Sequence, residues 1–307
     1  MAIDKSSVQV NLRLPSELKL AAERAAAEDH RSLTSLIEKL LADHTRNGPT
    51  LQDWHDLGRA RFLSFFDDEK HAAQIRQGSH TFSYLVRTTS GEQIRPEDLT
   101  NKLRGIYRTL NSLVGAAHIF YPYTRRDLQP HFTSDAGLRS GKTSQLLEFI
   151  GVPELLSWGQ FWRVSPSGLV TNSRPHREDQ DDFSKFGLET GKWFWPFSMT
   201  HGLAEIVLHA QLFSELFSSA EVVEFRCEWS GLHDRALADP ESKDTWRDIH
   251  MAFGDECVTV GEWPVTDLRM SWPEIVSILG GGVMRLFDPT FDCSPEWVRG
   301  QIPRWGK

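Results

Sequence analysis

Residues 8–14 constrain the fold of this chain more than any other stretch. Every second residue there is apolar: Val8, Val10, Leu12 and Leu14. Strict alternation over this length is the period of a β-strand with one buried and one exposed face. Pro15 ends the pattern, because proline cannot donate a hydrogen bond to a ladder. A lone short strand leaves backbone groups unpaired, so the sequence predicts a homodimer in which a second copy supplies the antiparallel partner.

The exposed face of this predicted strand carries Gln9, Asn11 and Arg13. Glutamine and asparagine can bind adenine edges through two hydrogen bonds, and arginine can bind guanine edges in the same way. A two-stranded ribbon is slim enough to enter the major groove of DNA. The three side chains therefore indicate a sequence-reading surface, although a plain solvated strand face has the same polarity.

Two helical patterns follow Pro15. The first covers residues 16–29, begins at a capping serine and is rich in alanine and other strong helix formers. The segment 30–32 interrupts it, and Ser32 caps the second pattern. Apolar residues there recur at the spacing of one buried helical face: Leu33, Leu36, Ile37, Leu40 and Leu41.

Strand, helix, turn and helix within fifty residues resemble the ribbon-helix-helix family of DNA-binding proteins, of the Arc and MetJ type. The likeness is carried by Asn11-Leu-Arg-x-Pro15 and Arg31-Ser32. It implies base contacts by Gln9, Asn11 and Arg13. It also implies phosphate contacts at the start of the second helix, from Ser32, the main chain of Leu33, and Thr34. The implied dimer core consists of Val8, Val10, Leu12, Leu14, Leu36, Ile37, Leu40 and Leu41.

The net charge of −8 is not the bulk signature of a nucleic-acid-binding protein. Residues 1–47 are balanced, with seven Lys/Arg and seven Asp/Glu, so the rest of the chain carries the whole excess. Lys5, Arg13 and Arg24 would have to supply the attraction to phosphate. We therefore expect modest non-specific affinity for double-stranded DNA and a reliance on paired dimers at adjacent half-sites.

The 307 residues exceed one average domain. Glycine and proline within 46–50 favour a boundary after residue 47, followed by a helix over 48–77 that either connects two domains or begins the second. The predicted fold class is thus an N-terminal ribbon-helix-helix domain followed by an α+β domain over 78–307. Strands are expected at 81–88, 116–123, 161–164, 169–172, 222–229 and 257–260, helices at 96–114, 144–150, 201–217 and 272–287, and an exposed loop at 174–189.

Two patterns leave alternatives open. Gly137-Leu-Arg-Ser-Gly-Lys142-Thr143 shares its end with a phosphate-binding loop, but it lacks the first glycine and a preceding buried strand, which favours an exposed turn. Glu205 and His209, with His201 nearby, form a helical row that could bind a metal or could be satisfied within the core. Three widely spaced cysteines have no zinc-ligand spacing. We expect no metal and no cofactor.

Residues 161–168 and 226–235 resemble a segment that accompanies Schlafen/AlbA-like domains in some bacterial proteins, which adds only an association with nucleic-acid modules. The sequence as a whole predicts a cytoplasmic, nucleoid-associated repressor whose larger domain senses a small-molecule effector or mediates assembly. No membrane partner is expected, because no apolar run approaches the length of a span. Two alternatives are a DNA-binding head on a nucleotide-acting or defence enzyme, and a DNA-organising protein without a ligand.

Overall fold

The computed structural model describes residues 16–28, 32–34, 50–65, 77–114, 130–134, 145–151, 159–179, 189–238 and 250–301. The chain divides into two compact units, Met1–Pro49 and Thr50–Lys307. No helix in these ranges is long and apolar enough to cross a membrane.

Helix α1, Ser16–Glu28, is the longest element described in the first unit. It forms where the sequence is rich in alanine, which loses no side-chain entropy in a helix. Lys19 and Glu23, one turn apart, form an exposed ion pair of 3.7 Å. Ala26 is buried, whereas most of the other described side chains of α1 are exposed.

The predicted fold class, a ribbon-helix-helix domain followed by an α+β domain, is wrong for this structure. The structure is an α+β fold built on one seven-stranded antiparallel sheet, and its first described strand, β1, begins only at Ser79. The described segments before β1 that have regular structure are helical. Alternation shows which side chains could share a strand face, but a strand also needs a partner for its backbone groups. The predicted strand itself, residues 8–14, lies outside the described ranges, as does the strand predicted at 116–123.

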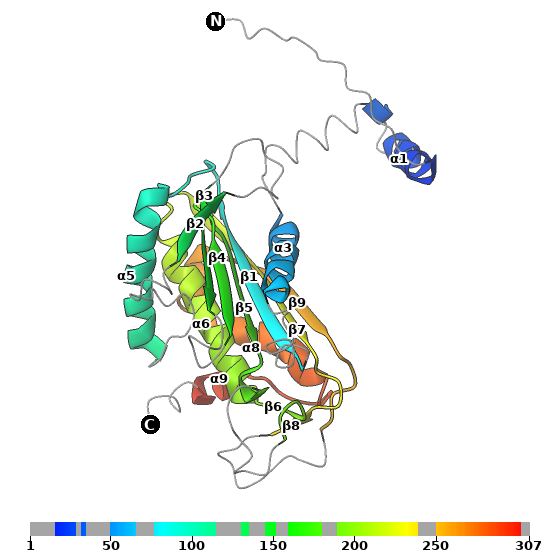
Figure 1. Cartoon of the computed structure of the whole chain (residues 1–307), viewed down its shortest axis with the longest axis vertical. Helices are drawn as coiled ribbons and strands as arrows, with labels where there is room; N and C mark the ends of the chain where they lie inside the picture. The colour runs from blue at the N-terminus through cyan, green and yellow to red at the C-terminus, as the bar shows by residue number, and fades with distance from the viewer. Residues whose placement is uncertain are drawn as a thin grey trace, which may run out of the picture. The chain divides into compact units, whose positions relative to one another are not determined.

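The sheet has the strand order β2-β3-β4-β5-β1-β7-β9, and each neighbouring pair is antiparallel (Figure 1). The strands are β1 (Ser79–Thr88), β2 (His131–Ser134), β3 (Gln145–Gly151), β4 (Gln160–Val164), β5 (Leu169–Pro175), β7 (Ala220–Ser230) and β9 (Cys257–Pro264). A separate parallel pair joins β6 (Trp193–Phe194) to β8 (Ala236–Leu237). Because β1 pairs with both β5 and β7, it is an inner strand of the sheet.

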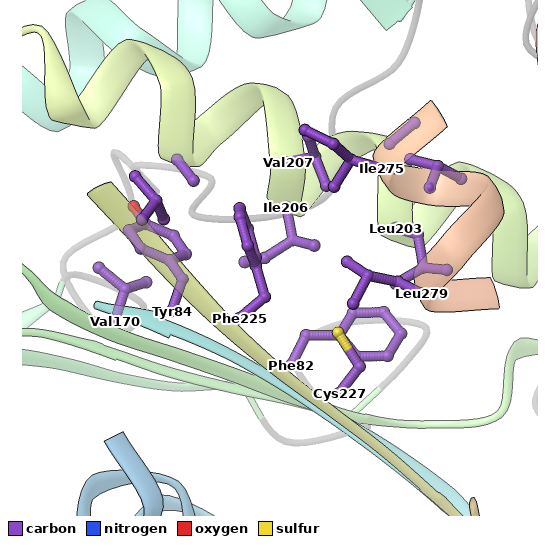
Figure 2. Close-up of a cluster of buried hydrophobic side chains, with 14 of the residues drawn as sticks. Phe82, Tyr84, Val170, Leu203, Ile206, Val207, Phe225, Cys227, Ile275 and Leu279 are labelled. Atoms are coloured by element: carbon purple, nitrogen blue, oxygen red, sulfur yellow. The ribbon is translucent and has the colours of Figure 1, made fainter. Parts of the chain in front are cut away.

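One face of the sheet packs against helices α5 (Pro96–Val114), α6 (Pro196–Ser214) and α8 (Trp272–Arg285). Figure 2 shows Phe82 and Tyr84 of β1 on the side of the sheet where Leu203 and Ile206 of α6 lie. Helix α6 is buried along almost its whole length, since α5 and α8 flank it while the sheet covers a third side. The shorter helices are η2 (Arg177–Asp179), α7 (Val265–Leu268) and α9 (Pro295–Gln301).

Helix α3, Leu51–Ser64, covers the opposite face of the sheet, as both figures show. A capping box fixes its start: the Asp53 backbone N–H donates to the Thr50 hydroxyl, and the Thr50 N–H donates to the Asp53 carboxylate. Trp54 is fully buried and packs in one cluster with Leu146 of β3 and Leu169 of β5. The helix therefore belongs to the second unit.

Several sequence predictions are confirmed: the strands at β1, β4, β5, β7 and β9, and the helices at α5, α6 and α8. The predicted hairpin joins β4 to β5 through a turn in which the Gly168 N–H donates to the Ser165 carbonyl. Gly168 has φ of +98°, and a Cβ there would lie 2.8 Å from the Val86 carbonyl oxygen. A side chain at this position would therefore both strain the backbone and displace β1.

Two predictions for this unit are wrong. Residues 144–150 were expected to form a helix, but the segment is strand β3. Its apolar residues fall on both sides because both faces of the sheet are covered, which erases the alternation typical of a one-sided strand. Residues 174–189 were expected to form an exposed loop. In the described part, β5 continues to Pro175, and Glu178 and Asp179 of η2 are buried.

Candidate functional site

The DNA-contact and dimer-core residues predicted from the sequence fall largely outside the described ranges. These are Lys5, Gln9, Asn11 and Arg13, together with Val8, Val10, Leu12, Leu14, Leu36, Ile37, Leu40 and Leu41. Arg24 is exposed on α1, Ser32 and Thr34 are exposed, and Leu33 is half-buried. The role of all of them stays a prediction.

A polar cluster lies on the face of the sheet that α6 covers, beneath the first half of that helix. His80 of β1 and Arg174 of β5 are directly opposite each other in the ladder. The Arg174 guanidinium donates to the Glu205 carboxylate of α6 over 3.2 Å, and Nδ1 of His201 lies 3.9 Å from the same carboxylate. Three elements thus converge on one partly buried ion pair.

Some polar atoms in this cluster have no hydrogen-bond partner among the described residues: His80 Nε2, Arg174 Nε and Asn172 Oδ1. Burial holds the pKa of His80 well below its ordinary range, and the charge of Arg174 lowers it further. His80 is therefore neutral at physiological pH. The cluster combines one compensated charge pair with neutral donors and acceptors, a composition suited to orienting a polar group.

Two members of the helical row His201, Glu205 and His209 are engaged by side chains of the sheet. Glu205 is held by Arg174, and the Tyr84 hydroxyl lies 2.7 Å from Nδ1 of His209. Burial lowers the pKa of His209 to about 3. Within the described ranges, no group of three or more ligand-type side chains is arranged to hold a metal ion. Arg174 and Tyr84 of the sheet thus hold Glu205 and His209 in place within the second unit.

Arg235 is fully buried and joins four segments of the second unit. Its guanidinium donates to both Asp179 oxygens, over 2.9 and 2.5 Å, which is the two-point geometry that makes arginine–carboxylate pairs strong. Its remaining N–H groups donate to the backbone carbonyls of Gly231, Trp193 and Gln77. Each of the five N–H groups of the guanidinium therefore has an acceptor, and Arg235 is a structural tie between these segments.

Glu178, next to this tie, makes the stability of the protein depend on pH. Burial, together with the charge of Asp179, raises its pKa from the ordinary 4.5 to about 7. The folded chain therefore keeps a proton that the unfolded chain loses. This contribution to stability is fully present below pH 4.5 and is lost as pH rises through about 7.

We expect Glu178→Gln to flatten the decline in unfolding free energy between these pH values, because glutamine stays neutral throughout. Urea unfolding followed by circular dichroism on both sides of the window measures it. Glu189→Gln, at an exposed carboxylate of the same region, is the matched control and should leave the slope unchanged. An unaltered slope in Glu178→Gln would contradict the assignment.

On the other face of the sheet, α3 covers a buried relay of serine, histidine and glutamate. His55 Nδ1 lies 3.0 Å from the Ser83 hydroxyl, and His55 Nε2 lies 3.2 Å from the Glu228 carboxylate. Ser83 also contacts the Thr171 hydroxyl at 2.7 Å, and Arg59 pairs with Glu228 at 2.9 Å. These are the residue types of nucleophilic catalysis, but His55 and Ser83 are fully buried beneath the helix. The relay fastens α3 to the sheet.

Sequence reasoning missed this relay. His55 lies 28 residues from Ser83 and 173 from Glu228, so no local motif connects them. The one local signal was the run of polar residues at alternate positions of β1, Ser79, Thr81 and Ser83, which reads as a solvent-facing strand surface. Instead, all three are buried under α3.

A surface cleft of about 330 Å³ lies beside α3 and is called here the β9 cleft. It is lined by Leu51 and Gln52 of α3, Glu224 and Arg226 of β7, and Val260 and Glu262 of β9. Its volume is within the range of small-molecule sites. Unlike the two buried clusters, it is open to solvent.

Comparisons of this chain with models of protein families, with curated proteins and with solved structures give no match.

Proposed function

We propose that this protein is a sequence-specific DNA-binding transcriptional regulator that acts as a repressor. The first unit contacts DNA, and the second responds to a ligand or mediates assembly. The observation that carries the proposal is the trio Gln9, Asn11 and Arg13, whose side chains match the hydrogen-bonding edges of adenine and guanine. These residues belong to Met1–Pro49, a compact unit distinct from the rest of the chain.

The distribution of charge and exposure supports the same division of roles. Residues 1–47 are electrically balanced, whereas the remainder carries the net charge of −8 and would repel the phosphate backbone. Arg24, Ser32 and Thr34 are exposed in the first unit and so are available to phosphate. DNA contact would therefore be confined to the first unit.

The proposal includes a homodimer, and two such dimers can occupy adjacent half-sites on DNA. A two-fold symmetric protein reads two copies of the same half-site, so the operator should be palindromic or repeated. Location at the nucleoid follows from this role. The effector, where one acts, would bind the second unit.

Arg13→Ala is expected to weaken operator binding by about 1–3 kcal/mol and to relax the base preference, because one two-point contact to guanine is lost. Fluorescence anisotropy on operator and on scrambled DNA of equal length, at fixed salt, measures both effects.

Arg24→Ala is the matched control for this prediction, since it removes an arginine assigned to phosphate. It should weaken binding to both DNAs alike. Equal losses on the two DNAs for Arg13→Ala would refute its role in reading bases.

A further inference from the structure

Arg226 of β7 lines the β9 cleft. Arg226 makes no hydrogen bond or ion pair with any described residue, and its Nε is buried. The two carboxylates on its own strand face, two residues away on either side, are already engaged: Glu228 by His55 and Arg59, and Glu224 by Arg87. A half-buried guanidinium in this situation favours an anionic group that enters the cleft.

The same cleft contains a carboxylate, Glu262 of β9, that also lacks an ion-pair partner among the described residues. Glu224 of β7 and Glu262 of β9 are directly opposite each other in the ladder, and like charges in such positions repel. Arg87 pairs with Glu224. Glu262 has no ion-pair or hydrogen-bond partner among the described residues, so it favours a cationic group.

Arg226 and Glu262 lie close together in the sheet. Arg226 is directly opposite Val260, and Glu262 is two residues further along β9 on the same face. Diagonal neighbours across a ladder are roughly 7–8 Å apart at their backbones, within reach of long side chains. A ligand that carries both charges can therefore satisfy both residues at once.

Two aliphatic residues also line the cleft. Val260 is 64 % exposed, which is unusual for a branched aliphatic residue on a strand, and Leu51 of α3 is 8 % exposed. An aliphatic or aromatic group between them would remove apolar surface from water.

We propose that the β9 cleft binds a free α-amino acid with an apolar side chain. The ligand carboxylate accepts hydrogen bonds from Arg226, its ammonium group donates to Glu262, and its side chain packs on Val260 and Leu51. The inference does not depend on DNA binding. In a regulator, such a ligand would be the effector.

Isothermal titration calorimetry of the full chain with L-leucine, L-valine, L-methionine and L-phenylalanine tests the proposal. At least one of these should bind saturably at millimolar concentration or below. Its N-acetyl derivative, which lacks the ammonium charge, and its amide, which lacks the carboxylate charge, should each bind on the order of tenfold more weakly.

Arg226→Gln and Glu262→Gln should each weaken binding of that amino acid on the order of tenfold or more. Arg269→Gln and Glu221→Gln, at exposed positions outside the cleft, are the matched controls and should bind as the wild type does. Unchanged near-ultraviolet circular dichroism shows that each variant is folded.

Three results would overturn the proposal: no binding of any of the four amino acids, wild-type affinity in both cleft variants, or equal affinity for the amino acid and its N-acetyl derivative. Loss of binding in Arg269→Gln to the same extent as in Arg226→Gln would also overturn it. None of these results bears on whether the first unit binds DNA.

Discussion

Replacing Arg235 by alanine is expected to destabilise the second unit by about 3–5 kcal/mol, the range for removing one partner of a buried ion pair. The change leaves the Asp179 carboxylate buried without its guanidinium. It also leaves the backbone carbonyls of Gly231, Trp193 and Gln77 without their donor. Chemical unfolding in urea, followed by tryptophan fluorescence, measures the loss.

Two comparisons make this expectation specific to the pair. Arg269→Ala, at an exposed arginine, should change the unfolding free energy by no more than about 0.5 kcal/mol. The double variant Arg235→Ala with Asp179→Ala should lose less than the sum of the two single variants, because neither charge is then stranded. Additive losses would show that the contacts of Arg235 do not act as one unit.

Phe82→Ala is expected to cost about 3–5 kcal/mol, the range for deleting a large aromatic side chain from a core. Phe82 is fully buried on β1, and its ring meets that of Trp229 edge-on at a centroid distance of 5.2 Å. A Cβ at Gly202 of α6 would lie 3.4 Å from the same ring, so the helix already packs closely over it. The cavity could not close by a small shift of α6.

The unfolding midpoint in urea and the thermal midpoint of the same variant should both fall. Phe253→Ala is the matched control, since this ring is 65 % exposed and should cost little. A loss for Phe82→Ala no larger than for Phe253→Ala would mean that the β1–α6 interface is not the centre of the core.

The sequence predicted those elements whose apolar residues recur at the spacing of a single strand or helix face. Alternate apolar residues marked β1 and β7, and the three-to-four spacing of Leu99, Leu103, Ile106 and Leu110 marked α5, because each of these segments has one distinct apolar side. The β4–β5 hairpin was predictable because Ser165 and Gly168 impose a turn that does not depend on the rest of the fold.

The elements missed are those whose pattern depends on distant segments. Strand β3 is apolar on both sides because helices lie on both faces of the sheet, and no local signal reveals the second layer. Likewise, Arg235 and Asp179 are 56 residues apart. Their pairing exists only once β5 and β8 have been brought together, so the charges of residues 174–179 read as a solvated loop.

The candidate site shows the same limit. Ser79, Thr81 and Ser83 at alternate positions of β1 could be read as a solvated face, yet the structure buries all three, and Ser83 contacts His55. Arg226 and Glu262 lie in unrelated sequence contexts and become neighbours only through the β7–β9 register. The strand predicted at residues 8–14 shows a different limit. Its alternation is strong, but the fold class predicted from it is not the fold of the structure.

The most direct test of the proposed function is footprinting of the full chain on the DNA upstream of its own coding sequence, at physiological salt, with Arg13→Ala as the comparison. The account expects a protected segment with palindromic or repeated half-sites for the wild type, and weaker, less selective protection for the variant. No protection at any protein concentration, or protection that is identical on unrelated DNA, would contradict it.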